Sequence, residues 1–432
     1  MLSKRLRFKL KSTSDELTSQ SGIVLFGKYI FKLGLSKLID SIFPLPKSFN
    51  GYLPSEYIFP LVLNLHGGGS NLDDIKLIKE DTGLRKLLNI NNVSSSWALG
   101  NWLRSHSSKE GIANIDNVNH KISNLALMSD NVTNYTLDID ASEIVAEKMA
   151  AQYTYKKNKG YMPILGHLAE NGLVLHSEFR EGNIPPADNN YQFVKDCVEK
   201  MPFGKRIGSF RADSATYQSD IVNYCESREI SYAIGGRLDT AVKDIIKHIP
   251  EQDWHSYNNG HYNTDDQIAE TIHSMETTNS FRLIIKRSLL HNDLLGKDYI
   301  YHVIISNRKN ETAEETLNWY HQRGETSENR IKELKIGFNM EKMPCGQFAA
   351  NALYFYIGVL SYNLSIMFKT EILPEEFKKK KISSIRWRLY QIPGKIVTTA
   401  RYLYLKIQIH HLELFQIILS RIYNLNSSRM LC

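Results

Sequence analysis

Hydrophobic and polar residues alternate along a short segment in the middle of the chain, residues 134–140. Side chains of a β-strand point alternately to opposite faces, so Leu137 and Ile139 would face one way and Asp138 and Asp140 the other. Asp140 is the last residue of this run, where the chain leaves the sheet. The pattern therefore predicts a strand that presents a carboxylate at its end.

Two further apolar segments, residues 163–169 and 173–180, are separated by a turn that contains Asn171-Gly172. An Asn-Gly pair between apolar runs is a strong signal for a β-hairpin. Beyond the hairpin the apolar period switches between that of helices and that of strands. It predicts a helix at 189–200, a strand at 207–213, a helix at 217–228 and a strand at 230–234.

This order of elements is that of a ribonuclease H-like fold, an α/β class with a mixed five-stranded sheet and helices. Its first and fourth strands would end in Asp140 and Asp213. One aspartate at a strand end is common, but two at these strands are what a nuclease-like fold needs to hold a divalent metal ion against a phosphodiester.

A later helix supplies a third carboxylate. At about 100° per residue, Glu328 and Lys335 project roughly 20° apart at one edge of an apolar stripe. The stripe consists of Ser327, Ile331, Leu334 and Phe338, and Asn329 and Glu333 point to the opposite side. By itself the helix could be a surface helix with Glu/Lys pairs; the upstream aspartates favour a site at Glu328.

The chain resembles the DDE transposases of bacterial insertion sequences, in the branch with the Tyr-Arg-Glu-Lys motif and the insertion sequence thirteen-eighty type. The resemblance spans residues 137–337, about half the chain. It rests on Tyr320 and Arg323 and on the segments 137–142, 159–163, 178–183, 211–214 and 328–335.

The resemblance implies a role for each matching residue. Asp140, Asp213 and Glu328 would be the catalytic, metal-binding triad, and Tyr320, Arg323 and Lys335 would contact the phosphates of the transposon end. Water would first free a 3′-hydroxyl at the element end, and that hydroxyl would then attack target DNA.

The spacing departs from the family pattern at one point, because four residues rather than three separate Arg323 from Glu328. Strict spacing would select Ser327, which cannot bind metal as a carboxylate does. We keep Glu328 because its step to Lys335 fits, and we expect a turn at Gly324 to take up the extra residue. Asp138 is the alternative first carboxylate, since it shares a face with Asp140.

Oxygen ligands of this kind suit Mg²⁺, for which Mn²⁺ can substitute. Two ions about 3.5–4 Å apart stabilise the attacking and leaving oxygens of an in-line displacement. The expected partner is DNA, both the element's terminal inverted repeats and the target, bound by a homodimer. Charge agrees, since 53 basic and 46 acidic residues give a net charge of +7.

Other features narrow the class of protein. Hydrophobic residues make up 42% of the 432 residues, enough for a substantial core in two to four domains. The four cysteines form no CxxC pair, which argues against a zinc site and fits a reducing compartment. We find neither a signal peptide nor a membrane span, and expect a bacterial cytoplasmic protein at the nucleoid.

The region before residue 134 reads as helices at 23–42, 55–66, 71–88 and 95–104. The last of these resembles the second helix of a helix-turn-helix, which would bring Arg104 to DNA. A plain helical bundle with Trp97 and Trp102 in its core is an equally good interpretation.

Residues 236–312 read as a mostly β insertion, with strands at 265–275, 281–287 and 299–306. Trp254 in this insertion could stack on a flipped base, although a core tryptophan is the favoured interpretation. The predicted organisation is a helical DNA-binding region at 1–133, the first part of the core at 134–235, the insertion at 236–312, the core completion at 313–370 and a basic helical region at 371–432.

Two other functions fit part of this pattern. A different two-metal nuclease, such as a junction resolvase, would share the carboxylates but lack strand transfer. A non-catalytic DNA-binding relic of a transposase would normally have lost a carboxylate, and all three are present.

Overall fold

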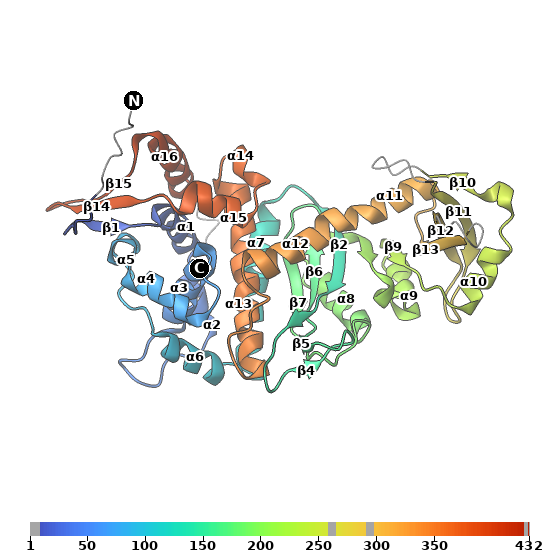
Figure 1. Ribbon diagram of the computed structural model, residues 1–432, viewed down its shortest axis with the longest axis horizontal. Coiled ribbons are helices and arrows are strands. Elements are labelled where there is room, and N and C mark those ends of the chain that lie inside the picture. The colour runs from blue at the N-terminus through green and yellow to red at the C-terminus, as the bar shows by residue number, and fades with distance from the viewer. Residues whose placement is uncertain (1–8, 258–264, 291–297, 427–430, 432) are drawn as a thin grey trace, which may run out of the picture.

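The computed structural model describes residues 9–257, 265–290, 298–426 and 431. The molecule is elongated, with a helical part that contains the N-terminal residues at one end and a large mixed β-sheet extending to the other (Figure 1). The sheet has nine strands in the order β10-β11-β12-β13-β9-β8-β2-β6-β7. A mixed α/β fold is therefore confirmed.

Five of these strands form the part of the sheet that the sequence predicts. They are β2 (Asn134–Ala141), β6 (Ile164–Leu168), β7 (Val174–Glu178), β8 (Arg206–Ala212) and β9 (Ser231–Gly235). Strands β2, β8 and β9 run parallel, while β6 pairs antiparallel with β2 and β7 antiparallel with β6. The hairpin turn between β6 and β7 contains Gly172 at φ 85°, a left-handed conformation that glycine adopts readily.

The insertion continues the same sheet and does not form a separate one. Its strands are β10 (His255–Ser256), β11 (Gln267–His273), β12 (Phe281–Leu290) and β13 (Asp298–Ser306), and β13 pairs antiparallel with β9. The expected five-stranded sheet is therefore too small. The insertion also contains the short helix α10 (Thr240–Lys247).

Helices cover both faces of the core strands. The predicted helices α8 (Asn190–Glu199) and α9 (Ser219–Ser227) are present. Phe193 and Cys197 of α8 lie against Gly166 of β6, beside Leu137. The opposite face is covered by α11 (Ala313–Arg323), the π-helical turn Gly324–Glu328, α12 (Asn329–Lys332) and a second π-helical turn Glu333–Gly337. Together these four segments run from the insertion to the region of β2 and α13 (Figure 1).

Helix α13 (Phe348–Met367) is buried on all sides. A helix that is apolar all round belongs in a core, and its polar side chains bond internally. Asn363, for example, exchanges hydrogen bonds of 2.9 Å with the backbone of Val174. Helix α13 packs along α7 (Lys109–Ser129), between the helical part and the sheet (Figure 1).

The first hundred residues are mostly helical, as predicted. The helices are α1 (Ser21–Lys32), α2 (Leu35–Ile42), α3 (Pro54–Gly67), α4 (Ile75–Glu80), α5 (Thr82–Leu88) and α6 (Ser96–Ser105). Gly34, at φ 83°, separates α1 from α2, where the sequence pattern indicated one helix. In α6 Trp102 is buried but Trp97 is 75% exposed, so the pure bundle interpretation is wrong for Trp97.

Small sheets complete the fold. Strands β3 (Ile144–Val145), β4 (Gln152–Tyr153) and β5 (Lys159–Tyr161) form one beside the end of β2, and β1 (Glu16–Thr18), β14 (Gly394–Thr398) and β15 (Leu403–Lys406) form another. The second sheet joins the two ends of the chain, so the C-terminal region is not purely helical. Its helices are α14 (Glu375–Lys378), α15 (Ile382–Ile385) and α16 (Ile409–Tyr423).

Within the part of the chain that the structure describes, no helix combines the length and the apolar character that crossing a membrane requires.

Candidate active site

Asp140 lies one residue before the end of β2 and its side chain is mostly buried, with 22% exposed. Burial raises its pKa to about 6; Arg323 lowers that pKa, while the negative charges of Asp213 and Glu328 raise it. A carboxylic acid whose charged form is disfavoured by burial and by other carboxylates is typical of functional sites.

Asp213 follows β8 directly, and β8 is the parallel neighbour of β2. The carboxyl ends of parallel strands meet at one edge of a sheet, which brings Asp213 near Asp140. Its side chain accepts a hydrogen bond of 3.0 Å from the backbone N–H of Ala215. It also borders a pocket that Tyr320 and Gly235 line.

Glu328 is exposed and is the last residue of the first π-helical turn. Its charge acts on Asp140, so the three carboxylates occupy one region. Among the described residues, however, they do not form a group whose ligand atoms all lie within 4.8 Å of one another. In this conformation the three carboxylates are therefore too far apart for one metal ion to reach all of them, and Glu328 is exposed to solvent.

Asp138 has a structural partner that the sequence analysis did not foresee. It is fully buried, and both its oxygens bond the guanidinium of Arg211, at 2.7 and 2.9 Å. Thr326 donates a third bond, of 2.8 Å. These three hydrogen bonds join β2 to β8 and to the π-helical turn. The oxygens of Asp138 are therefore already engaged, and Asp138 is unsuited to be the alternative first carboxylate.

Arg323 is buried beside the candidate site, where a contact with solvent-exposed phosphates was expected. Its Nη2 donates to the carbonyl of Ile139 at 3.2 Å and lies 3.8 Å from Oδ1 of Asp140. Tyr320 lies one helical turn earlier, and burial together with Asp213 raises its pKa. Arg323 is therefore placed to stabilise the charge of Asp140.

Lys335 lies at the other end of the candidate site. Its Nζ donates to Ser142 Oγ at 3.1 Å and to the carbonyl of Glu143 at 2.5 Å, and burial lowers its pKa. The lysine thus holds the chain just beyond β2.

The extra residue between Arg323 and Glu328 occupies a π-helical turn, where we expected a loop-like turn at Gly324. A π-helical turn takes one more residue than an α-helical one and occurs often at functional sites. The helix therefore continues without a break, and Ser327, Ile331 and Leu334 are buried as the predicted stripe requires.

The two remaining candidate DNA contacts differ in exposure. Trp254 is only 6% exposed and stacks against the guanidinium of Arg287, 4.1 Å from the ring centroid, which agrees with the core interpretation. Arg104 is exposed and lines a groove together with Trp97, Lys148 and Lys342, although Asp73 and Glu341 line it too. We call this groove the α6 groove.

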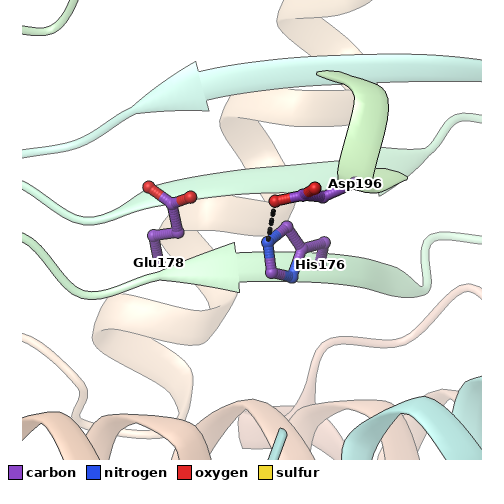
Figure 2. A group of neighbouring side chains, drawn as sticks. All are labelled: His176, Glu178 and Asp196. Carbon is purple, nitrogen blue, oxygen red and sulfur yellow. Dashed lines mark ion pairs between the residues drawn. The ribbon is translucent and has the colours of Figure 1, made fainter. Parts of the chain in front are cut away.

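A second polar cluster was missed at the sequence level. His176 and Glu178 of β7 and Asp196 of α8 bring one ligand atom each within 4.8 Å of the others (Figure 2). Segment 178–183 contributed to the family resemblance, but nothing in the sequence connects it to Asp196.

The sequence matches the family described as Transposase DDE domain group 1 over residues 2–427. The fold and the match define the class of protein: the chain belongs to this family of DDE transposases. Comparison with curated proteins finds no match.

Among solved structures, the fold is similar to one described as the cryo-EM structure of piggyBac transposase synaptic complex with hairpin DNA. The TM-score is 0.48 and the identity 10%, over 88% of this chain and 82% of that one.

Proposed function

We propose that the protein is a DNA transposase of a bacterial insertion sequence, of the thirteen-eighty type. Asp140, Asp213 and Glu328 would be its catalytic carboxylates, in a ribonuclease H-like core formed by β2, β6, β7, β8 and β9. The observation that carries the proposal is the family match over residues 2–427, together with the positions of Asp140 and Asp213 at the ends of the neighbouring parallel strands β2 and β8. The charges of the carboxylates gather where two parallel strands end beside a helix.

The donor set supports divalent metal binding. Three carboxylates offer only oxygen ligands, which suit Mg²⁺ and Mn²⁺. A cation would offset the repulsion that raises the pKa of Asp140. The proposal includes two such ions. Such ions, when bound, stabilise the attacking and leaving oxygens of phosphoryl transfer.

The protein's own residues would prepare that chemistry. Arg323 favours the charged form of Asp140, and Lys335 fixes the backbone at Glu143, three residues further along. The side chains of Arg323 and Lys335 also add positive potential where a scissile phosphate would lie. Tyr320 borders the pocket beside Asp213, which would place its hydroxyl near the DNA strand.

DNA would extend from the candidate site along the α6 groove. This groove also contains Val145 and Ala146, which follow Glu143 closely in sequence. Arg104, Lys148 and Lys342 would contact phosphates, and the exposed ring of Trp97 could stack on a base. A homodimer would bind the terminal inverted repeats and the target.

The decisive experiment uses DNA that flanks the gene, since the element's ends should lie there as short inverted repeats. Purified protein with Mg²⁺ should cleave at these ends, leave a 3′-hydroxyl and join it to a target plasmid. Asp140→Asn, Asp213→Asn and Glu328→Gln should each abolish cleavage while DNA binding stays nearly intact. Asp244→Asn, which changes an exposed aspartate of α10, is the matched control.

Cleavage without joining would favour a two-metal nuclease such as a junction resolvase. Binding without cleavage would favour a non-catalytic relic. An Asp140→Asn protein that still cleaves would refute the assignment of the triad.

A further inference from the structure

The His176, Glu178 and Asp196 cluster lies on the face of the sheet opposite the candidate active site. Asp140 pairs across the sheet with Leu165, and Leu165 pairs with Ser177. Paired residues share a face, and neighbours along a strand point to opposite faces. His176 and Glu178 therefore face away from Asp140, towards α8.

The imidazole of His176 is nine-tenths buried, with 9% exposed, and has carboxylates on two sides. Nε2 lies 3.9 Å from Oδ2 of Asp196, and Nδ1 lies 3.8 Å from Oδ1 of Asp116 on α7. Among the described residues Nδ1 has no hydrogen-bond partner. Both separations exceed the roughly 2.7–3.2 Å of a hydrogen bond, so direct bonding does not explain this arrangement.

In each carboxylate of the cluster, one oxygen accepts a hydrogen bond from a neighbouring side chain, and the other oxygen takes no part in that bond. Asp196 Oδ1 accepts from Gln192 Nε2 at 2.8 Å, while Oδ2 is the oxygen beside His176. Glu178 Oε2 accepts from Arg180 Nε at 2.9 Å. The side chains of Glu178 and Asp196 lie on the same side of β7 as the ring of His176 (Figure 2).

We propose that His176, Glu178 and Asp196 bind one transition-metal ion of the Zn²⁺ class, separate from the catalytic ions. Zn²⁺ binds histidine nitrogen and carboxylate oxygen at about 2.0–2.2 Å, which puts ligand atoms roughly 3–3.5 Å apart. On binding, ligand atoms that now lie within 4.8 Å of one another would draw closer, to that separation. Imidazole favours Zn²⁺ over Mg²⁺, which prefers oxygen ligands alone.

Asp116 is not one of the three proposed ligands, but it would orient the ring of His176. A metal-bound histidine usually donates its other ring N–H to a carboxylate, which orients the ring. Asp116 lies on that side of His176, and Lys200 Nζ bonds its Oδ2 at 2.6 Å. The ring of Phe193 stacks on His176, with centroids 4.9 Å apart. The ion would tie the edge strand β7 to α8.

The test is a calorimetric titration of the EDTA-treated full-length protein with Zn²⁺ in an excess of Mg²⁺, which occupies sites made of oxygen alone. We expect one Zn²⁺ per chain and a higher melting temperature. Asp196→Asn and Glu178→Gln should each weaken Zn²⁺ binding by about tenfold or more. His176→Gln should abolish it, and the two carboxylate variants decide the matter if that protein does not fold.

Two controls locate the ion. Adjacent His410 and His411, whose rings lie 3.8 Å apart, are another possible Zn²⁺ site, so the His410→Ala/His411→Ala protein should bind Zn²⁺ normally. Asp140→Asn should also bind it normally, which separates this inference from the proposed catalysis. Absence of Zn²⁺ binding, binding unchanged by Asp196→Asn, or loss of binding in the His410/His411 variant would each overturn the proposal.

Discussion

Arg211 and Asp138 form a buried ion pair at the centre of the sheet, with Nε–Oδ1 at 2.7 Å and Nη2–Oδ2 at 2.9 Å. The pair joins neighbouring parallel strands, β8 and β2. Arg211 also donates to the carbonyl of Trp319 at 2.6 Å, and its guanidinium lies over the Trp319 ring at 4.9 Å. One arginine thus connects both strands to α11, which carries Tyr320 and Arg323.

Asp138→Asn should destabilise the protein by about 3–5 kcal/mol, because it leaves the charge of Arg211 buried without a partner. The measurement is the midpoint of urea unfolding with and without the substitution. Asp138→Asn/Arg211→Met, which removes both charges, should recover part of the loss. A midpoint that Asp138→Asn leaves unchanged would contradict the structural role given to the pair.

Asp140→Asn should have the opposite effect on stability. The pKa of Asp140 is about 6 in the folded protein, above the ordinary aspartate value of 3.8, so ionisation disfavours the folded state. That cost is absent below pH 3.8 and complete above pH 6. Asp140→Asn should therefore stabilise the metal-free protein by up to about 3 kcal/mol at pH 8.

This gain should vanish near pH 4, and the measurement is thermal unfolding in EDTA at both pH values. Asp244→Asn, which changes an exposed aspartate of α10, is the control for the loss of a carboxylate elsewhere. A stability gain that did not change with pH would mean that burial of the charge is not its cause.

Arg323→Gln tests the electrostatics of the candidate site. The guanidinium lowers the pKa of Asp140, so its removal should raise that pKa above about 6. The acid limb of the pH dependence of DNA cleavage should then move to higher pH, as should the titration of the Asp140 carboxyl by carbon NMR. Arg330→Gln is the control, since Arg330 bonds the carbonyls of Leu168 and Ala169 instead.

Lys335→Ala should weaken DNA binding and lower the slope of log K against log salt by about one unit, as expected for one lost phosphate contact. The measurement is a binding titration at several salt concentrations. Lys247→Ala removes an exposed lysine from α10 and should leave the slope unchanged. An unchanged slope in Lys335→Ala would restrict Lys335 to its bonds with Ser142 and Glu143.

The core strands were predictable because each is a local pattern. Alternation identified β2, the Asn171-Gly172 turn fixed the β6–β7 hairpin, and apolar runs located β8 and β9. Long-range pairings leave no such trace. Nothing in the sequence of β13 says that it pairs with β9 and enlarges the sheet, or that β1 pairs with β14 far away in the chain.

The candidate site was likewise predictable only in part from the sequence. Strand period and strand ends predicted Asp140 and Asp213 as site residues, but not the depth at which each side chain lies. Asp138 and Asp140 share a face, yet one is fully buried in an ion pair and the other is partly exposed. The depth of a side chain depends on which helix covers the sheet. The position of Arg211 beside Asp138 depends on that same packing, which the sequence does not show.

Ser327 and Glu328 are neighbours in the π-helical turn but differ in burial. Ser327 is fully buried, and its hydroxyl has no hydrogen-bond partner among the described residues. Ser327→Ala removes a buried polar group without creating a large cavity. The free energy of unfolding should therefore stay the same or rise by about 1 kcal/mol, and DNA cleavage should be unaffected.

Glu328→Gln should behave in the reverse manner, with unchanged stability because the side chain is exposed, and with no cleavage. Glu325 lies three residues before Glu328 in the same π-helical turn, and its side chain lies outside the described residues; we expect Glu325→Gln to have a mild effect. Cleavage assays and thermal unfolding on the three variants measure these differences. If Glu325→Gln abolished cleavage and Glu328→Gln retained it, the π-helical turn would present the other glutamate, and our assignment of the third carboxylate would be wrong.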